Sequence, residues 1–497
     1  MTNLRLDRFA FVAVGLAIVT GVVATRVGVA AIFVCLGLGI LAAAIRTSRR
    51  FAPPARDGYT VVLPLLLMPT VLGLTAFAER RITFVLAGLI ILALTQSRRR
   101  EHTFRQPLIV AALVLSLLLP ASRYLTTLYV QVWHAETLIL ILVCARRYPF
   151  PSVVKSLLDG VGLFLIANVL GYLAGVESPA AAGRTFSLDS STGGIRVFFP
   201  LTSSLAVPPL MAAIFVAAGL ICLEGGRAVR VYRAVALLAG IFIMVAANTR
   251  VALVVSAVVL VASVVAPLIF ARASVYLAAF PMVLPFVYPL LAVVVLQPVI
   301  HVAASLFPFL SRGDTEADVA LEGRDRIWSM AISFWQEQVD FIHRLVGFGE
   351  FGQRSSGASA AYANGDPLLL GFSSHNSTLQ QLFDGGLVGV ASLAFLGLAA
   401  VITLRRGALL PSRVHLIALC AGVAALLGGG TEVTQAPGYA VETFWVFACL
   451  ALAAATQPSR GAVTKDELAA GADGLTAAPE RVVTSAGSAH GTSTSNR

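Results

Sequence analysis

The chain has 497 residues, of which 58% are hydrophobic and 12% are charged, and its formal net charge is +11. A soluble globular protein carries about 45–50% apolar and about 25% charged residues, so this composition excludes a soluble enzyme. It also excludes a disordered chain, which would be polar. The apolar runs are unbroken, whereas the strands of a transmembrane β-barrel alternate. The sequence therefore predicts an all-α, polytopic integral membrane protein.

In chain order, 14 segments are candidates for membrane-spanning helices, because a helix needs about 20 apolar residues to cross a bilayer. They are residues 9–25, 27–45, 59–78, 82–96, 107–122, 127–145, 157–174, 200–223, 233–248, 251–270, 274–296, 386–404, 414–428 and 439–456. Several of these segments are short, so we expect 12–14 transmembrane helices.

These segments divide the chain into four regions. Residues 1–296 hold helices 1–11, residues 297–385 form one long extracytoplasmic loop, and residues 386–456 hold helices 12–14. Residues 457–497 are rich in Ala, Gly, Ser and Thr and cannot bury a core, which predicts a disordered cytoplasmic tail.

The positive charge is a topology signal here rather than a sign of nucleic-acid binding, and no nucleic-acid partner is expected. With the N-terminus in the cytoplasm, the short cytoplasmic segments hold 20 Lys and Arg residues and the short outer loops hold 7. The positive-inside rule therefore predicts a multi-pass protein of the cytoplasmic membrane, with both termini in the cytoplasm and the lipid bilayer as its surroundings.

The long loop contains an amphipathic segment at residues 327–342. The apolar side chains of this segment share one helical stripe: Trp328, Ile332, Trp335, Val339 and Ile342. The pattern predicts a helix that lies on the outer membrane surface. The alternative is a helix that packs on the core of the loop itself.

Ionisable residues inside apolar segments are costly and are therefore candidates for function. His134 and Glu136 lie in one predicted helix, and Glu442 lies in the last one. We expect them to form interhelical hydrogen bonds or ion pairs. In an alternative function, a polytopic transporter or flippase of the cell envelope, they would form a coupling path. A non-catalytic scaffold for envelope assembly is a third possibility.

A histidine and several arginines converge on the predicted outer face. His375 ends the long loop directly before an apolar helix, and Arg250 follows an outer turn between two helices. The loop also carries the segment GRDRIW at 323–328 and the glycine-rich segment GFGEFG at 347–352. A guanidinium group matches the geometry of a phosphate, and an imidazole accepts a proton near neutral pH. The combination favours an anionic ligand and a reaction that needs one base.

These segments resemble the O-antigen ligase and polymerase superfamily. The family pattern is His, then Asn, Ser or Gln, then nine residues, then Gly-x-x-Gly, and it is matched here by His375, Asn376, Gly386 and Gly389. Thr249 and Arg250 at a helix start are similar to the family's Ser-Arg motif, with Thr in place of Ser. The order of the two loop segments and the three final helices fits as well, and the resemblance covers about residues 235–455.

The resemblance implies a membrane glycosyltransferase with a GT-C-like helical fold that works in surface polysaccharide biosynthesis. Its donor would be a glycan carried on a polyprenyl diphosphate such as undecaprenyl diphosphate. Its acceptor would be a hydroxyl group of a lipid, a glycan or a protein at the outer face of the membrane. Ligases and polymerases share the motif, so both activities stay open.

The resemblance also implies the roles of single residues. His375 would be the base that activates the acceptor, and Asn376 would orient it. Arg250 and Arg324 would bind the diphosphate, and Arg326 could exchange roles with Arg324. No cofactor or metal is expected, which agrees with the absence of an Asp-x-Asp pair from the sequence.

Each of these residues also has a purely structural explanation. His375 would cap the helix that follows it. Arg324 would form an ion pair with Asp325 or Glu322, and Arg250 would anchor its helix at the membrane interface.

Overall fold

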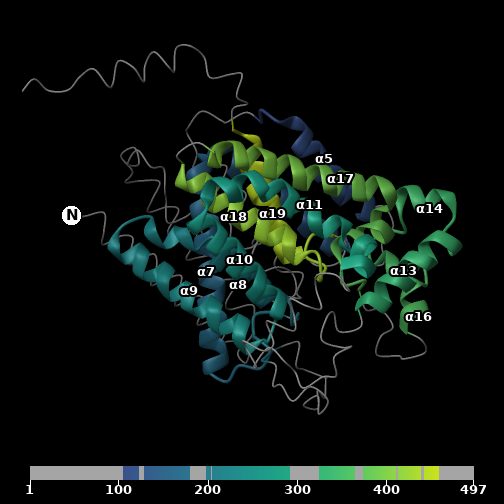
Figure 1. Ribbon diagram of the computed structural model, residues 1–497, viewed down its shortest axis with the longest axis horizontal. Coiled ribbons are helices and arrows are strands. Elements are labelled where there is room, and N and C mark those ends of the chain that lie inside the picture. Colours follow the sequence, from purple (N-terminus) through teal and green to yellow (C-terminus); the bar gives the residue numbers. More distant parts are fainter. Residues whose placement is uncertain are drawn as a thin grey trace, which may run out of the picture. The chain divides into compact units, whose positions relative to one another are not determined.

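The computed structural model describes residues 104–121, 128–178, 197–202, 204–291, 324–363, 373–409, 412–437 and 441–457. All of them belong to one unit, Met1–Gln457, and Figure 1 shows their helices. The predicted helices at 9–25, 27–45, 59–78 and 82–96 lie outside the described residues, as do the first part of the long loop and the predicted disordered tail.

The described residues form helices and no strand. Seven α-helices precede the long loop: α5 (Pro107–Ala121), α6 (Leu128–Arg147), α7 (Phe150–Leu173), α8 (Val207–Ala217), α9 (Arg227–Ala246), α10 (Arg250–Val265) and α11 (Pro267–Leu291). A short 3-10 helix, η2 (Gly219–Leu223), follows α8. The loop holds α13 (Arg324–Gln338), α14 (Phe341–Val346), α15 (Gly352–Ser355) and α16 (Ala358–Ala363). The chain then forms α17 (Ser377–Ala408), α18 (Arg413–Gly428) and α19 (Val441–Ala455).

Four of these helices are long and apolar enough to cross a membrane: α7, α9, α11 and α17. Shorter apolar helices pack among them, and α9, α10 and α11 leave large apolar side chains exposed, among them Leu238, Val258 and Phe286. An apolar surface of this kind suits a lipid bilayer rather than water. The chain is therefore helical and has the features of a membrane protein.

Consecutive helices run between two ends of the bundle. At one end, the backbone N–H of Arg105 before α5 donates to the carbonyl of Ala455 at the end of α19 (2.9 Å). At the same end, the ring of Phe150 at the start of α7 stacks on His415 near the start of α18, with 4.6 Å between ring centroids. We call this the arginine end, because Arg146, Arg147, Arg405, Arg406 and Arg413 also lie at helix termini there.

The opposite end carries the helices of the long loop, and we call it the loop end. The backbone N–H of Glu350 in the loop donates to the carbonyl of Pro120 near the end of α5 (2.9 Å). Figure 1 shows α13, α14 and α16 gathered beyond one end of α17. The end of α11 and the start of α17, which flank the loop, therefore lie at this same end of the bundle.

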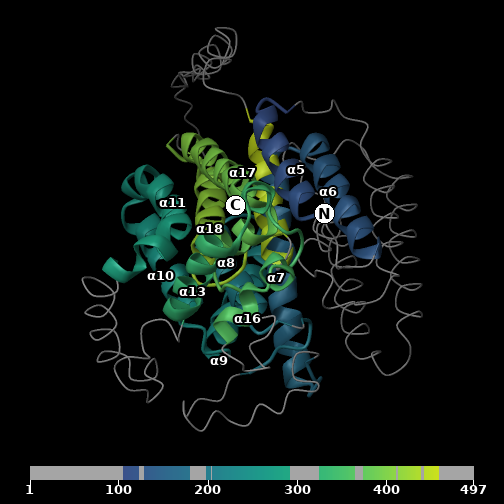
Figure 2. The same cartoon turned by 90° about the vertical axis from the view of Figure 1, so that its right-hand side faces the viewer.

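Helix α17 is central to the bundle and packs against α5, α11, α18 and α19. In Figure 2, α17 and α18 lie between α10 and α11 on one side and α5 and α6 on the other. Helix α19 is buried all round from Phe444 to Ala455. Its many small residues let the surrounding helices approach closely.

A buried ion pair holds helices together near the arginine end. The Arg233 guanidinium of α9 donates to both carboxylate oxygens of Asp159 in α7, at 2.7 and 2.9 Å. It also donates to the carbonyls of Ile221 and Glu224, at 3.1 and 2.8 Å, so its donors are used within the protein. The fork geometry of the pair favours a structural role, because a buried charge is tolerated when it is paired and hydrogen-bonded.

Several predicted boundaries are corrected. The turn between α10 and α11 lies at Ala266 and not near Arg272, and the predicted segment 200–223 is the short α8 followed by η2. Helix α17 begins at Ser377, nine residues before the predicted start, because it includes a kink at Gly386 that a hydropathy pattern cannot reveal.

The predicted amphipathic helix at 327–342 is two helices, because Asp340 caps α14 and interrupts the stripe. Trp328 is buried between α11 and α17, and its ring meets Tyr288 edge-on with 5.4 Å between centroids. Helix α13 therefore packs against α11 and α17 as well as against α16 of the loop, whereas Ile342 is exposed on α14.

Candidate active site

The candidate site begins where α17 starts. Asn376 is the N-cap of this helix, and its side-chain oxygen accepts hydrogen bonds from the backbone N–H groups of Thr378 (2.9 Å) and Leu379 (3.0 Å). The amide group of the same side chain donates to the carbonyls of Gly430 (2.9 Å) and Pro281 (3.3 Å). Asn376 thus joins the start of α17 to α11 and to the segment after α18. Since Asn376 fills the cap position, the alternative that His375 caps this helix is wrong.

His375 itself has an unusual backbone conformation. Its φ is +47°, in the left-handed region, where residues other than glycine are uncommon. Such conformations persist where the surrounding contacts enforce them, and they gather at functional sites. The hydrogen bonds of the next residue, Asn376, supply that enforcement.

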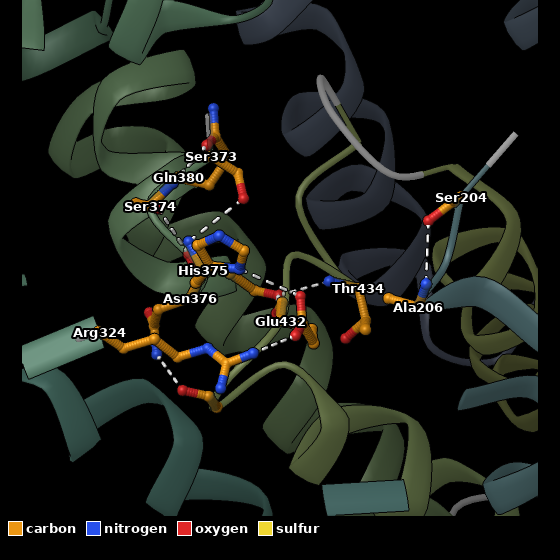
Figure 3. A network of polar contacts seen from close by, with 12 residues as sticks. Ser204, Ala206, Arg324, Ser373, Ser374, His375, Asn376, Gln380, Glu432 and Thr434 are labelled. Atoms are coloured by element: carbon orange, nitrogen blue, oxygen red, sulfur yellow. Dashed lines mark hydrogen bonds and ion pairs between the residues drawn. The ribbon is translucent and has the colours of Figure 1, made fainter. Parts of the chain in front are cut away.

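The imidazole of His375 faces an acidic side chain that completes a three-residue bridge. Its Nδ1 lies 3.3 Å from Oε2 of Glu432, in the segment between α18 and α19. The other carboxylate oxygen of Glu432 accepts a hydrogen bond from the Arg324 guanidinium at the start of α13. Figure 3 shows Glu432 between the two partners. Residues from three separate elements therefore meet at the loop end.

The charges in this bridge fix the ionisation of Glu432. Burial alone would raise the pKa of its carboxyl group, but the neighbouring Arg324 guanidinium and the His375 ring outweigh burial and hold the pKa at about 2. Glu432 is therefore a carboxylate at neutral pH, which agrees with its ion pair with Arg324.

Two further contacts position the members of the bridge. The indole N–H of Trp328 donates to the carbonyl of Ser374 (2.9 Å), which fixes α13 beside the residue before His375. Arg324 lies one helical turn before Trp328, so this contact also fixes the backbone position from which the Arg324 side chain extends. The hydroxyl oxygen of Ser377 accepts hydrogen bonds from the backbone N–H groups of Thr434 (2.9 Å) and Gln435 (3.0 Å), which holds the segment that carries Glu432.

The glycine-rich segment 347–352 docks onto a kink in α17. At Gly386 the backbone has φ +64° and ψ −162°, so the helix is interrupted. The carbonyls of Phe383 and Asp384 before the kink accept hydrogen bonds from the N–H groups of Phe348 (2.7 Å) and Gly349 (3.0 Å). The loop thus donates hydrogen bonds to backbone carbonyls that lose their helical partners at the kink.

Close backbone contact explains why glycine occupies several of these positions. A Cβ atom on Gly386 would lie 2.4 Å from the carbonyl carbon of Leu345, and one on Gly352 would lie 2.3 Å from the carbonyl oxygen of Phe383. Gly389, the second glycine of the motif, leaves room for the amide of Gln381, whose nitrogen would lie 2.9 Å from an added Cβ.

The predicted diphosphate-binding arginines occupy different positions. Arg250 is the first residue of α10, directly after the end of α9, and therefore lies at the loop end, as predicted. Arg324 pairs with Glu432, whereas the side chains of Glu322 and Asp325, its alternative partners, lie outside the described residues. Arg326 is exposed on α13. A role for these residues in substrate binding stays a prediction.

The other ionisable candidates lie in α6 and α19. His134 of α6 packs against Trp445 of α19 with 5.9 Å between ring centroids, which suits a structural role. Glu442 lies in α19, and its side chain is outside the described part of the protein. Among the described residues, no group of three His, Cys, Asp or Glu side chains could hold a metal ion. Metal-independent chemistry stays a prediction.

The sequence did not single out Glu432. It lies in the polar run TEVTQ at 431–435, between two apolar helices and after three glycines. A carboxylate in so short a connecting segment is a usable signal, because the segment must lie at the same end as His375. Its pairing with two residues 57 and 108 positions away is a tertiary feature that the sequence does not encode locally.

Comparison with known proteins returned no family model and no curated protein that matches this chain.

Proposed function

We propose that the protein is a glycosyltransferase that moves a glycan from a polyprenyl diphosphate onto an acceptor hydroxyl group. The proposal includes a GT-C-like fold of 12–14 transmembrane helices and places the loop end at the outer face of the cytoplasmic membrane. The observation that carries it is the contact of the motif histidine, His375, with Glu432, which in turn pairs with Arg324.

The proposed chemistry follows from this bridge. Because Nδ1 of His375 faces a carboxylate, the neutral ring keeps its proton on Nδ1, and Nε2 is the nitrogen that accepts a proton. The acceptor hydroxyl loses its proton to Nε2, and its oxygen forms a bond with the anomeric carbon of the donor. The bond between that carbon and the diphosphate breaks, and the electron pair goes to the diphosphate oxygen.

Arginine side chains would stabilise the leaving group. Negative charge grows on the diphosphate as the bond breaks, so fixed guanidinium groups stabilise the transition state more than the ground state. Arg324 pairs with the carboxylate that also contacts the base, and Arg250 begins a helix at the same end of the bundle. Both therefore suit a diphosphate-binding role.

Deletion of the gene tests the proposal. Loss of a transferase should cause lipid-linked glycan to accumulate with its sugars outside the membrane, where periodate reaches them in intact spheroplasts. Accumulation on the cytoplasmic side would instead identify a flippase and overturn the proposal. Long lipid-linked polymers would indicate a ligase, and single repeat units would indicate a polymerase.

A further inference from the structure

The carboxylate of Glu432 occupies the position that an anionic substrate would need. One of its oxygens accepts a hydrogen bond from Arg324, and the other lies 3.3 Å from His375. We propose that Glu432 is an internal substitute for the donor diphosphate: it holds Arg324 while the site is empty, and the arriving diphosphate takes Arg324 from it. This inference rests on the proposed function and adds an exchange of partners to it.

The exposure of the pair allows such an exchange. The side chains of Arg324 and Glu432 are 14% and 17% exposed, so the pair is not sealed from the outside of the protein. A diphosphate carries more negative charge than a carboxylate and offers several oxygens to the guanidinium fork. The guanidinium of Arg324 therefore interacts more strongly with a diphosphate than with the carboxylate of Glu432.

The backbone around Glu432 allows the side chain to move alone. The Ser377 hydroxyl donates to the carbonyl of Glu432 (3.1 Å) and accepts from the N–H groups of Thr434 and Gln435. These bonds hold the main chain of the segment in place. The exchange consequently needs only a side-chain movement that separates Arg324 from Glu432 and leaves Glu432 beside His375, with no movement of the helices.

The exchange would couple donor binding to the base. While Arg324 pairs with Glu432, the positive guanidinium offsets the charge of the carboxylate. Once the diphosphate holds Arg324, the carboxylate acts on the His375 ring alone and stabilises the positive charge that the neutral ring acquires when it takes the proton of the acceptor. Donor binding would then strengthen the base, so the donor binds before the acceptor reacts.

Binding of inorganic pyrophosphate to the purified full-length protein tests the exchange without any glycan. We expect Glu432→Gln to bind pyrophosphate at least about tenfold more tightly than the unaltered protein, because a competing ion pair is removed. A role of Glu432 in stability alone would leave binding unchanged or weaker. The control is Glu337→Gln, which removes the same charge from an exposed position of α13, where Glu337 contacts Ser333.

Two further variants locate the effect. Adding Arg324→Ala to Glu432→Gln should abolish the gain in affinity. Glu432→Asp keeps the charge on a shorter side chain and should bind pyrophosphate with intermediate affinity, so it tests the exchange even if Glu432→Gln does not fold.

The exchange is wrong if Glu432→Gln and Glu432→Asp bind no more tightly than the control, or if the gain survives Arg324→Ala. These outcomes are independent of glycan transfer. If Glu432→Gln binds pyrophosphate more tightly but the unaltered protein transfers no glycan, the exchange is supported and the proposed function is wrong.

Discussion

Replacement of Gly386 by alanine should destabilise the loop end strongly. This glycine adopts φ +64° and ψ −162°, a conformation almost restricted to glycine. An added Cβ would also lie 2.4 Å from the carbonyl carbon and oxygen of Leu345, and 2.5 Å from the backbone nitrogen of Val346. The contacts are with backbone atoms, so no side-chain rotation relieves them.

The magnitude follows from the two costs. The backbone conformation costs about 1–3 kcal/mol for a residue with a side chain, and the overpacking costs about 1–3 kcal/mol more. We therefore expect a loss of about 2–6 kcal/mol, which the protein can reduce by separating α14 from α17. That separation would also disturb the nearby bridge of Arg324, Glu432 and His375 and lower transfer activity.

Thermal unfolding in detergent measures the loss, with Gly397→Ala as the matched control in the same helix. A Cβ on Gly397 would meet the terminal methyl group of Met282 at 3.0 Å, and that flexible side chain can move away. Gly397→Ala should therefore unfold near the temperature of the unaltered protein. Equal midpoints for Gly386→Ala and Gly397→Ala would refute the described kink and its contact with α14.

Three further predictions address the cap, the metal and the topology. Asn376→Ala should lose about 2–4 kcal/mol of stability, because it removes the cap and the two hydrogen bonds to α11 and to the segment after α18, and a small change in the unfolding midpoint would argue against the described cap. Glycan transfer should continue in excess EDTA, and a loss that Mg²⁺ restores would exclude the metal-independent scheme. In intact cells, a cysteine in place of the exposed Ser355 should react with a membrane-impermeant thiol reagent, whereas one in place of Ser412 should not. The reverse pattern would invert the orientation.

Much of the described helical arrangement was predictable from hydropathy. The segments predicted near α5, α6, α18 and α19 agree with these helices to within a few residues. The segment predicted near α9 ends within two residues of that helix but starts at 233, whereas the helix begins earlier, at Arg227. The boundaries of α10, α11 and α17 were less accurate. The turn at Ala266 has no polar residue to mark it, and the kink at Gly386 depends on a loop that approaches from elsewhere in the chain.

The site was predictable in part. The motif identified His375 and Asn376, and the spacing of GRDRIW before GFGEFG placed Arg324 in the same loop. The separate roles of the two motif residues were not predictable, because these roles depend on side-chain contacts. Asn376 caps α17, and His375 faces Glu432. Glu432 was missed because a single acid in a short polar segment has no pattern of its own.

The most direct test of the central claim is the transfer activity of His375→Asn. Asparagine tolerates the left-handed backbone at φ +47°, and the cap belongs to Asn376, so this substitution removes the imidazole and leaves the local structure intact. Transfer from a polyprenyl-diphosphate-linked glycan to its acceptor is measured in reconstituted membranes, with His343→Asn as the control on the exposed helix α14. Loss of a general base predicts a fall in rate of about 10²–10⁴ for His375→Asn, with an unchanged unfolding midpoint and near-normal transfer by the control. Near-normal transfer by His375→Asn would show that the histidine is not the base and would contradict the account.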